Sequence, residues 1–247
     1  MEVHAHTHTE RKRLKHYLFE FLMLFLAVFC GFLAEYKLEH TIERNREKQF
    51  ITTLIEDLKS DTAQLTEVIT YKKRKEKMVD SLIMYLSSSD HGKHGNDIYY
   101  YARNLTRPQY FFPNDRTIQQ LKNSGSLRLI RNLAISDSIM YYDQQVRYLL
   151  TLNEDERNIR DNFRELIGTI FDGKVFYSQM DSVDFGNFNK PDGNPPLFLT
   201  DAISINKVIS CAQYLKAVTR GIRSRQESIK NAAGQLLLFL QKEYQLE

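Results

Sequence analysis

The sequence has few of the residues that bridge, bend or break a chain. It contains two cysteines, and Cys30 lies within an apolar run while Cys211 lies far from it, so we expect neither a disulfide framework nor a paired-cysteine metal site. Ten glycines and five prolines are spread over 247 residues, with none between Gly31 and Gly92, which favours long helices over many short strands. The formal net charge of +3 is too small to indicate a polyanionic partner, so we predict no nucleic-acid binding.

Charged residues make up 26% of the chain and apolar residues 42%, which is close to ordinary globular usage and argues against a disordered chain. After a membrane anchor, roughly 200 residues remain, which is enough to bury a core.

A long apolar run near the N-terminus decides the class of protein. Every residue from 21 to 34 is apolar or glycine, and extending the run back to Tyr17 adds one charge, Glu20. Residues 17–36 would span roughly 28 Å as a helix, close to the thickness of the hydrocarbon layer, with a tyrosine at each end for the two interfaces. We therefore predict a disordered basic and histidine-containing tail over residues 1–16, a transmembrane helix over 17–36 and a helical bundle domain over 37–247.

The anchor is predicted to stay on the chain. Cleavage after Ala34 would place Phe32 at the third position back, where signal peptidase requires a small residue. Four basic residues lie close together just before the run, and four more are spread over residues 37–48 after it. The glutamates among the second group count little in the positive-inside rule, so the denser cluster before the run decides. The positive-inside rule then favours a cytoplasmic N-terminus, so we expect a single-pass protein of the bacterial inner membrane with its bundle in the periplasm.

The remaining pattern is that of long helices. Apolar residues recur at helical spacing after the run, and one seven-residue register carries apolar side chains at every position except Lys72. We expect short helices over 97–105 and from about 115 to 122, and long helices from about 132–136 to 171 and from 201 almost to the C-terminus. The predicted fold is all-α, an elongated antiparallel bundle with three long helices and short connecting helices.

Two groups of charged residues are interpreted as solvated helix faces. The basic run from Lys72 to Lys77 holds five cationic side chains and could bind phosphate or anionic lipid. At helical rise, however, Lys72 lies roughly 50 Å from Tyr36, too far for the bilayer unless the helix bends back. No interleaved aromatic residue points to nucleic acid. The acidic residues between 154 and 165 alternate with arginines, which is typical of an exposed face and not of a catalytic carboxylate pair. No nucleotide-binding, zinc-protease or hydrolase motif is present, so we predict no enzymatic activity and no cofactor.

An aromatic cluster beside arginines is the one candidate for a ligand or interaction site. Such a group lines many small-ligand pockets, although a plug that closes the end of the bundle is the interpretation we favour. Its members are Tyr100, Arg103, Arg107, Tyr110, Phe112 and Arg116. The alternating His4, His6 and His8 could bind Zn²⁺, Ni²⁺ or Cu²⁺, but a disordered polar tail is the interpretation we favour. The oxygen-rich loop from Asp184 to Asn194 lacks the spacing of a calcium loop, so we predict no metal ion.

Three segments resemble a family of single-span membrane proteins from Bacteroidota that has no assigned activity. They are residues 20–35, EFLMLFLAVFCGFLAE; residues 46–58, where REKQF leads into LIEDL; and residues 114–130, NDRTIQQLKNSGSLRLI. The resemblance covers the first 130 residues and implies a single membrane span in a Gram-negative envelope. It implies no mechanism.

The sequence therefore predicts a membrane-anchored structural or protein-interaction module of the cell envelope. Small residues near one face of the span, Ala27, Gly31 and Ala34, together with the heptad pattern, favour a homodimer or another protein partner. The alternative is a sensor-type bundle outside the cytoplasm that binds a small ligand and acts with a partner protein.

Overall fold

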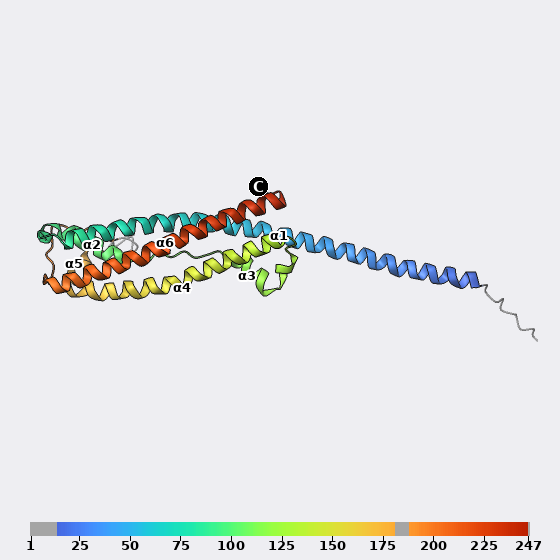
Figure 1. Ribbon diagram of the computed structural model, residues 1–247, viewed down its shortest axis with the longest axis horizontal. Helices are drawn as coiled ribbons and strands as arrows, with labels where there is room; N and C mark the ends of the chain where they lie inside the picture. The colour runs from blue at the N-terminus through green and yellow to red at the C-terminus, as the bar shows by residue number, and fades with distance from the viewer. Residues whose placement is uncertain (1–13, 181–187, 247) are drawn as a thin grey trace, which may run out of the picture. The chain divides into compact units, whose positions relative to one another are not determined.

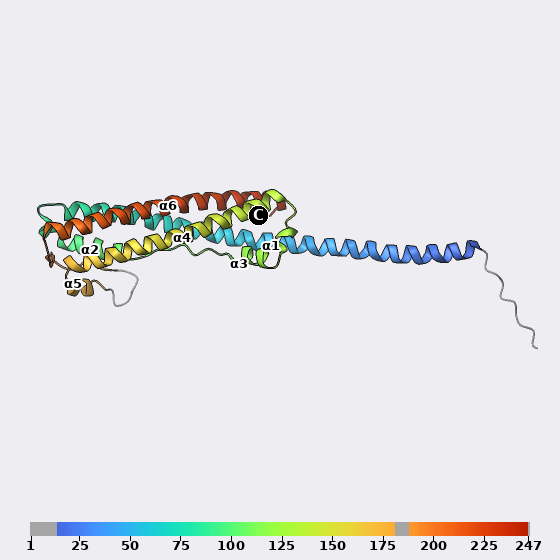
Figure 2. The same ribbon diagram turned by 60° about the horizontal axis from the view of Figure 1, so that its bottom comes forward.

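The computed structural model describes residues 14–180 and 188–246, and within these ranges the protein is helical without a β-strand (Figures 1 and 2). The expectation of an all-helical chain is confirmed. An isolated antiparallel bridge joins Met180 to Phe188. The helices are α1 (Leu14–Leu86), α2 (Gly95–Leu105), α3 (Arg116–Asn123), α4 (Leu133–Ile170), α5 (Gly173–Ser178) and α6 (Ala202–Tyr244), with short 3₁₀ turns at His91–His94 and Ser126–Leu129.

The chain divides into two units, residues 1–50 and residues 51–247. In the first unit, every side chain from Leu14 to Glu39 is exposed, including the whole apolar run. An 18-residue window of α1 has a mean hydropathy of 2.2, and none of it is buried by other parts of the protein. By length and composition, α1 is able to cross a membrane.

The second unit has a core built from heptad seams on three long helices. Buried residues of α6 recur at alternating spacings of four and three, which keeps one stripe of the helix facing its neighbours. This stripe consists of Ile205, Val208, Ala212, Leu215, Thr219, Ile222, Gln226, Ile229, Ala233, Leu236 and Leu240. Helix α4 has the same spacing from Ile135 to Ile170, and α1 has it from Ile51 to Leu86.

Helices α1 and α4 of this unit run in the same direction. Asp61 accepts a hydrogen bond from Tyr142, and further along both helices Lys72 pairs with Glu156. The expectation of a wholly antiparallel arrangement is therefore wrong for this pair. The reason is that residues 107–115 return along α1 without helical structure before α3 and α4 begin, a path that Figures 1 and 2 both show.

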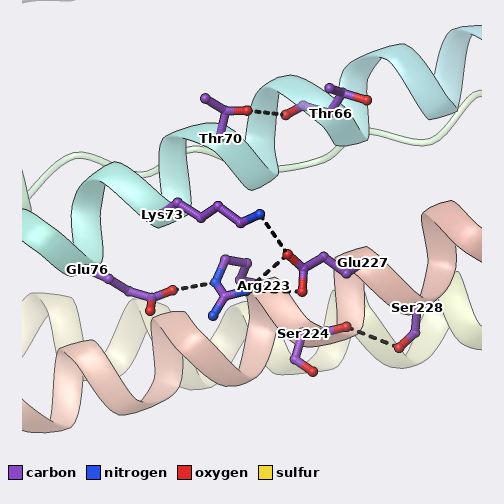
Figure 3. A network of polar contacts seen from close by, with 8 residues as sticks. All are labelled: Thr66, Thr70, Lys73, Glu76, Arg223, Ser224, Glu227 and Ser228. Carbon is purple, nitrogen blue, oxygen red and sulfur yellow. Dashed lines mark hydrogen bonds and ion pairs between the residues drawn. The ribbon is translucent and has the colours of Figure 1, made fainter.

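Helix α6 runs opposite to α1, and ion pairs fix their register (Figure 3). Arg223 donates to Glu76 at 2.6 Å and also pairs with Glu227, which in turn pairs with Lys73 at 3.2 Å. Each charge of this network has a partner of opposite sign within the protein, so the network gives no indication of a ligand-binding site.

Two aspartates of α1 hold the start of α3. Asp57, which is buried, accepts hydrogen bonds from the guanidinium of Arg116 and the hydroxyl of Thr117. Asp61 accepts from the backbone and side-chain nitrogens of Asn114 at 2.8 and 2.9 Å. Two of the segments that carry the family resemblance, residues 54–58 and 114–130, therefore contact each other. The N-cap residue of α3, Asp115, makes no side-chain capping bond, so the two side-chain bonds to Asp57 are what ties the start of this helix to α1.

Tyr99 joins α2 to α5 and to the loop before α6. Its buried ring packs edge-on against Phe171 at 4.8 Å, while its hydroxyl accepts from the backbone of Asp172 and donates to the carbonyl of Pro196. Beside it, Gly95 lies against the same loop, because a Cβ at this position would stand 2.1 Å from the carbonyl oxygen of Pro195.

Gly95→Ala is accordingly expected to lower the free energy of unfolding by about 1–3 kcal/mol, since loop backbone and not a flexible side chain fills the space. Urea unfolding of the full chain in detergent micelles, followed by circular dichroism, measures this. Gly168→Ala in α4, where a Cβ meets nothing within 4 Å, is the control and should not destabilise. Equal stability of the two variants would contradict the tight contact.

Candidate functional site

Two adjoining hollows lie between α1, α2 and the chain that follows α2. One has a volume of about 540 Å³ and the other about 750 Å³. Both are lined by Tyr71 and Arg74 of α1 and by Asn104 of α2. Arg107 contributes to the first hollow and Phe188 to the second. We call the pair of hollows the arginine groove.

The two arginines of the groove are held by aromatic rings. The guanidinium of Arg74 lies 5.5 Å from the ring centroid of Tyr71, and that of Arg107 lies 5.4 Å from that of Phe188. Within the described part of the chain, neither guanidinium is paired with a carboxylate. The groove also contains Lys190, but this side chain pairs with Asp97 at 2.7 Å.

Behind the groove, charged side chains replace apolar ones in the core of the second unit. The Nζ of Lys72 lies 2.5 Å from one oxygen of Glu156, and the Nζ of Lys75 lies 3.3 Å from the other. Arg160, one turn after Glu156 on α4, donates to the hydroxyl of Tyr110 at 2.8 Å. These four charged residues are at most 3% exposed, and we call them the buried charge layer.

The buried charge layer contains more positive than negative charge, since Lys72 and Lys75 pair with Glu156 while Arg160 bonds the neutral hydroxyl of Tyr110. Burial lowers the pKa of Lys75 to about 8 despite the attraction of Glu156, and it lowers that of Lys72 as well. Burial alone would raise the pKa of Glu156, but Lys75 and Lys72 outweigh it and hold that pKa below its ordinary value. The Nε and one terminal nitrogen of Arg160 are buried without an acceptor. The layer is therefore electrostatically incomplete.

The layer and the groove share the backbone of Arg107. The hydroxyl of Tyr71 and the Nζ of Lys75 both donate to its carbonyl oxygen at 3.3 Å. Tyr71 thus lines the groove, while its hydroxyl donates to the same carbonyl oxygen as Lys75 of the buried charge layer. Excess positive charge of the layer lies directly behind the floor of the groove.

The structure brings together only part of the predicted aromatic and arginine cluster. Tyr100 and Arg107 line the groove, and Arg103 stacks on Phe188 at 4.6 Å. The other three predicted residues lie elsewhere. Tyr110 contacts Arg160 of the buried charge layer, Phe112 is exposed, and Arg116 pairs with Asp57 at α3.

The interpretation of the two charged runs as solvated faces is wrong for the residues that form the buried charge layer. Lys72 and Lys75 are buried, while their neighbours Lys73, Arg74 and Lys77 are exposed as expected. Glu156 is likewise buried within the acidic stretch. The signal was present in the register, because Lys72 occupies a core position of the α1 heptad and so faces the other helices.

A change of pH should reveal the cost of burying Lys75. An unfolded chain keeps the proton on this lysine up to its ordinary pKa of 10.5, whereas the folded chain releases it near 8. Unfolded chains therefore bind more protons between these values, and stability contributed by this group rises with pH across that window.

We expect Lys75→Met to be more stable than the natural chain at pH 7, and the difference to shrink from pH 8 to pH 10.5. Thermal melts of both chains across this range measure the difference, with the exposed Lys77→Met as the matched control. If the stability difference between Lys75→Met and the natural chain does not change with pH, burial does not lower the pKa of Lys75.

Among the described residues, no group of three or more histidine, cysteine or carboxylate side chains is placed to hold a metal ion. His4, His6, His8 and part of the oxygen-rich loop, including Asp184 and Asn187, lie outside the described residues. The prediction that the protein uses no metal stays a prediction.

No protein-family model matches the chain, and neither a curated protein nor a solved structure is significantly similar to it. Functional interpretation therefore depends on the geometry above.

Proposed function

We propose that this protein is a membrane-anchored helical module of the bacterial cell envelope that works by binding other molecules and catalyses no reaction. The observation that carries the proposal is the contrast within α1. From Ile51 onward its apolar side chains enter a core, whereas the run from residue 21 to 34 is wholly exposed. A fully apolar exposed helix is unfavourable in water, so a lipid bilayer is the environment that suits it.

In this proposal, residues 17–36 cross the inner membrane once with the N-terminus in the cytoplasm. The three long helices then form an elongated bundle in the periplasm. The distribution of basic residues supports this orientation, and the resemblance to single-span proteins of Bacteroidota supports the envelope location.

A second copy of the chain is the partner we propose. The span carries small residues near one face and one cysteine, Cys30, which is exposed. The other cysteine, Cys211, is buried against the backbone of Ile159 and is a poor target for oxidants.

Oxidative crosslinking in native membranes tests this function. With Cys211→Ser as the starting chain, copper phenanthroline should convert a substantial fraction to disulfide-linked dimer through Cys30, and Cys30→Ser should abolish the product. A lysine-reactive crosslinker applied in parallel reports other partners. Recovery of monomer alone in both experiments would contradict an interaction module.

The arginine groove favours a second candidate function, a sensor-type module that binds a small ligand and signals through a partner. The groove volumes fall in the range of ligand pockets. A thermal-shift screen of the full chain tests it, and the absence of any stabilising small molecule would count against it.

A further inference from the structure

We propose that the arginine groove binds a small organic anion in which an aromatic ring carries a carboxylate. This inference deepens the second candidate function, and it does not depend on the partner or on the dimer.

The first reason is the state of the two arginines. Arg74 and Arg107 are each placed by an aromatic ring, and neither has a carboxylate partner among the described residues. A guanidinium whose position is fixed loses less conformational entropy when it binds. Its planar fork matches a carboxylate, which it can bind through two parallel hydrogen bonds.

The second reason is the charge behind the groove. Within the described residues, Lys72 and Lys75 pair with Glu156, and no ion pair joins Arg160 to a carboxylate. Lys75 also reaches the carbonyl of Arg107 from the buried side. Charges screened by little water act over longer distances than charges on a solvated surface. An anion in the groove would offset this excess without entering the core.

The third reason is the aromatic lining. Tyr100 and Tyr101 lie on one side of the groove with ring centroids 5.6 Å apart, and Tyr71 and Phe188 complete the set. Rings at these positions offer edge and face contacts to a planar ligand. Inorganic phosphate or acetate would satisfy the arginines but would present no ring to the aromatic side chains of the groove, so the lining favours a ligand that has a ring.

The test is isothermal titration calorimetry with the full chain in lipid nanodiscs. The probes are benzoate, 4-hydroxyphenylacetate and indole-3-acetate, each titrated up to 10 mM. Neutral benzamide, acetate and inorganic phosphate serve as matched probes that lack the charge or the ring. At least one aromatic carboxylate should bind saturably with one site per chain, and the matched probes should bind at least about tenfold more weakly.

Two variants identify the site. Arg74→Gln, which alters an exposed side chain, should weaken binding of the aromatic carboxylate at least about tenfold, and adding Arg107→Gln should abolish it. Arg157→Gln with Arg220→Gln removes the same charge from exposed positions outside the groove and should leave binding unchanged. Melting curves show whether each variant is folded.

Three results would overturn the proposal. They are absence of saturable binding by all three aromatic carboxylates, equal binding of benzamide, and undiminished binding by the folded Arg74→Gln chain. Tight binding of phosphate in place of the aromatic acids would also overturn it, because the rings would then have no role. Crosslinking through Cys30 is read separately, so failure here leaves the dimer proposal standing.

Discussion

Glu156→Gln is expected to lower the free energy of unfolding by about 3–5 kcal/mol, the largest effect we predict for a single substitution. The carboxylate of Glu156 bonds both Lys72 and Lys75 in a layer from which water is excluded. Glutamine keeps the shape but leaves three buried cations without an opposing charge, which is far more costly than the loss of a surface ion pair.

The exposed Glu154, half a turn earlier on α4, provides the control. Urea unfolding of the full chain should place Glu154→Gln within about 0.5 kcal/mol of the natural chain. Adding Lys75→Met to Glu156→Gln should recover part of the loss, because it removes one of the stranded charges. If Glu156→Gln and Glu154→Gln unfold at the same urea concentration, the buried charge layer does not exist as described.

Asp61→Ala is expected to cost about 2–4 kcal/mol and to loosen α3 before the rest of the protein unfolds. Asp61 accepts two bonds from Asn114 and one from the hydroxyl of Tyr142 at 2.6 Å, and its side chain is 1% exposed. Removal leaves the buried hydroxyl of Tyr142 and the backbone N–H of Asn114 without this acceptor, while the Asn114 amide keeps its bond to Ser60. Bonds to a charged group are the stronger class, so the cost is large.

Hydrogen exchange followed by mass spectrometry measures the local effect. Backbone amides of α3 should lose protection in Asp61→Ala, while those in the middle of α6 should keep it. Asp80→Ala, at an exposed position of the same helix, is the matched control. If α3 keeps its protection in Asp61→Ala, then Asp61 does not hold residues 107–115 and the start of α3 against α1.

Much of the secondary structure was predictable because its signals are local. Asp201 caps α6 by accepting from the backbone of Ser204, and α4 starts at Leu133 within the expected range, with Asn132 as its N-cap. The apolar seam of α1 is buried from Ile51 to Leu86 as its spacing indicates. Capping residues and heptads act within a few residues of each other, so one sequence is enough to find them.

The buried charge layer was not predicted, because the composition of residues 72–77 indicates an exposed helix face whereas their heptad register indicates core positions. Five basic residues within six positions indicate a solvated face, whereas the heptad places Lys72 in the core, and the structure follows the heptad. Thr219 and Gln226 of α6 resemble Lys72 in being polar residues at core positions of a heptad. The side-chain oxygen of each is buried without a hydrogen-bond partner. Polar residues at such positions commonly specify register.

The sequence predicted only part of the aromatic and arginine cluster, because residues 107–115 run along α1 and carry some members of the cluster away from the others. Tyr100 and Arg107 fall at the groove, but residues 107–115 then run along α1 and carry Tyr110 and Phe112 away from it. Phe188, which lies against both Arg103 and Arg107, comes from a distant part of the sequence, and no local pattern indicates this contact. A single sequence does not reveal such long-range contacts.

The topology of the chain in its membrane decides whether the helical unit belongs to the envelope. Asp192, an exposed residue of the loop before α6, is replaced by cysteine in a Cys30→Ser and Cys211→Ser background, and intact cells are treated with a membrane-impermeant maleimide. Labelling without lysis is expected, because the proposed orientation places the helical unit outside the cytoplasm. Labelling only after lysis would contradict it and would place the arginine groove among cytoplasmic molecules.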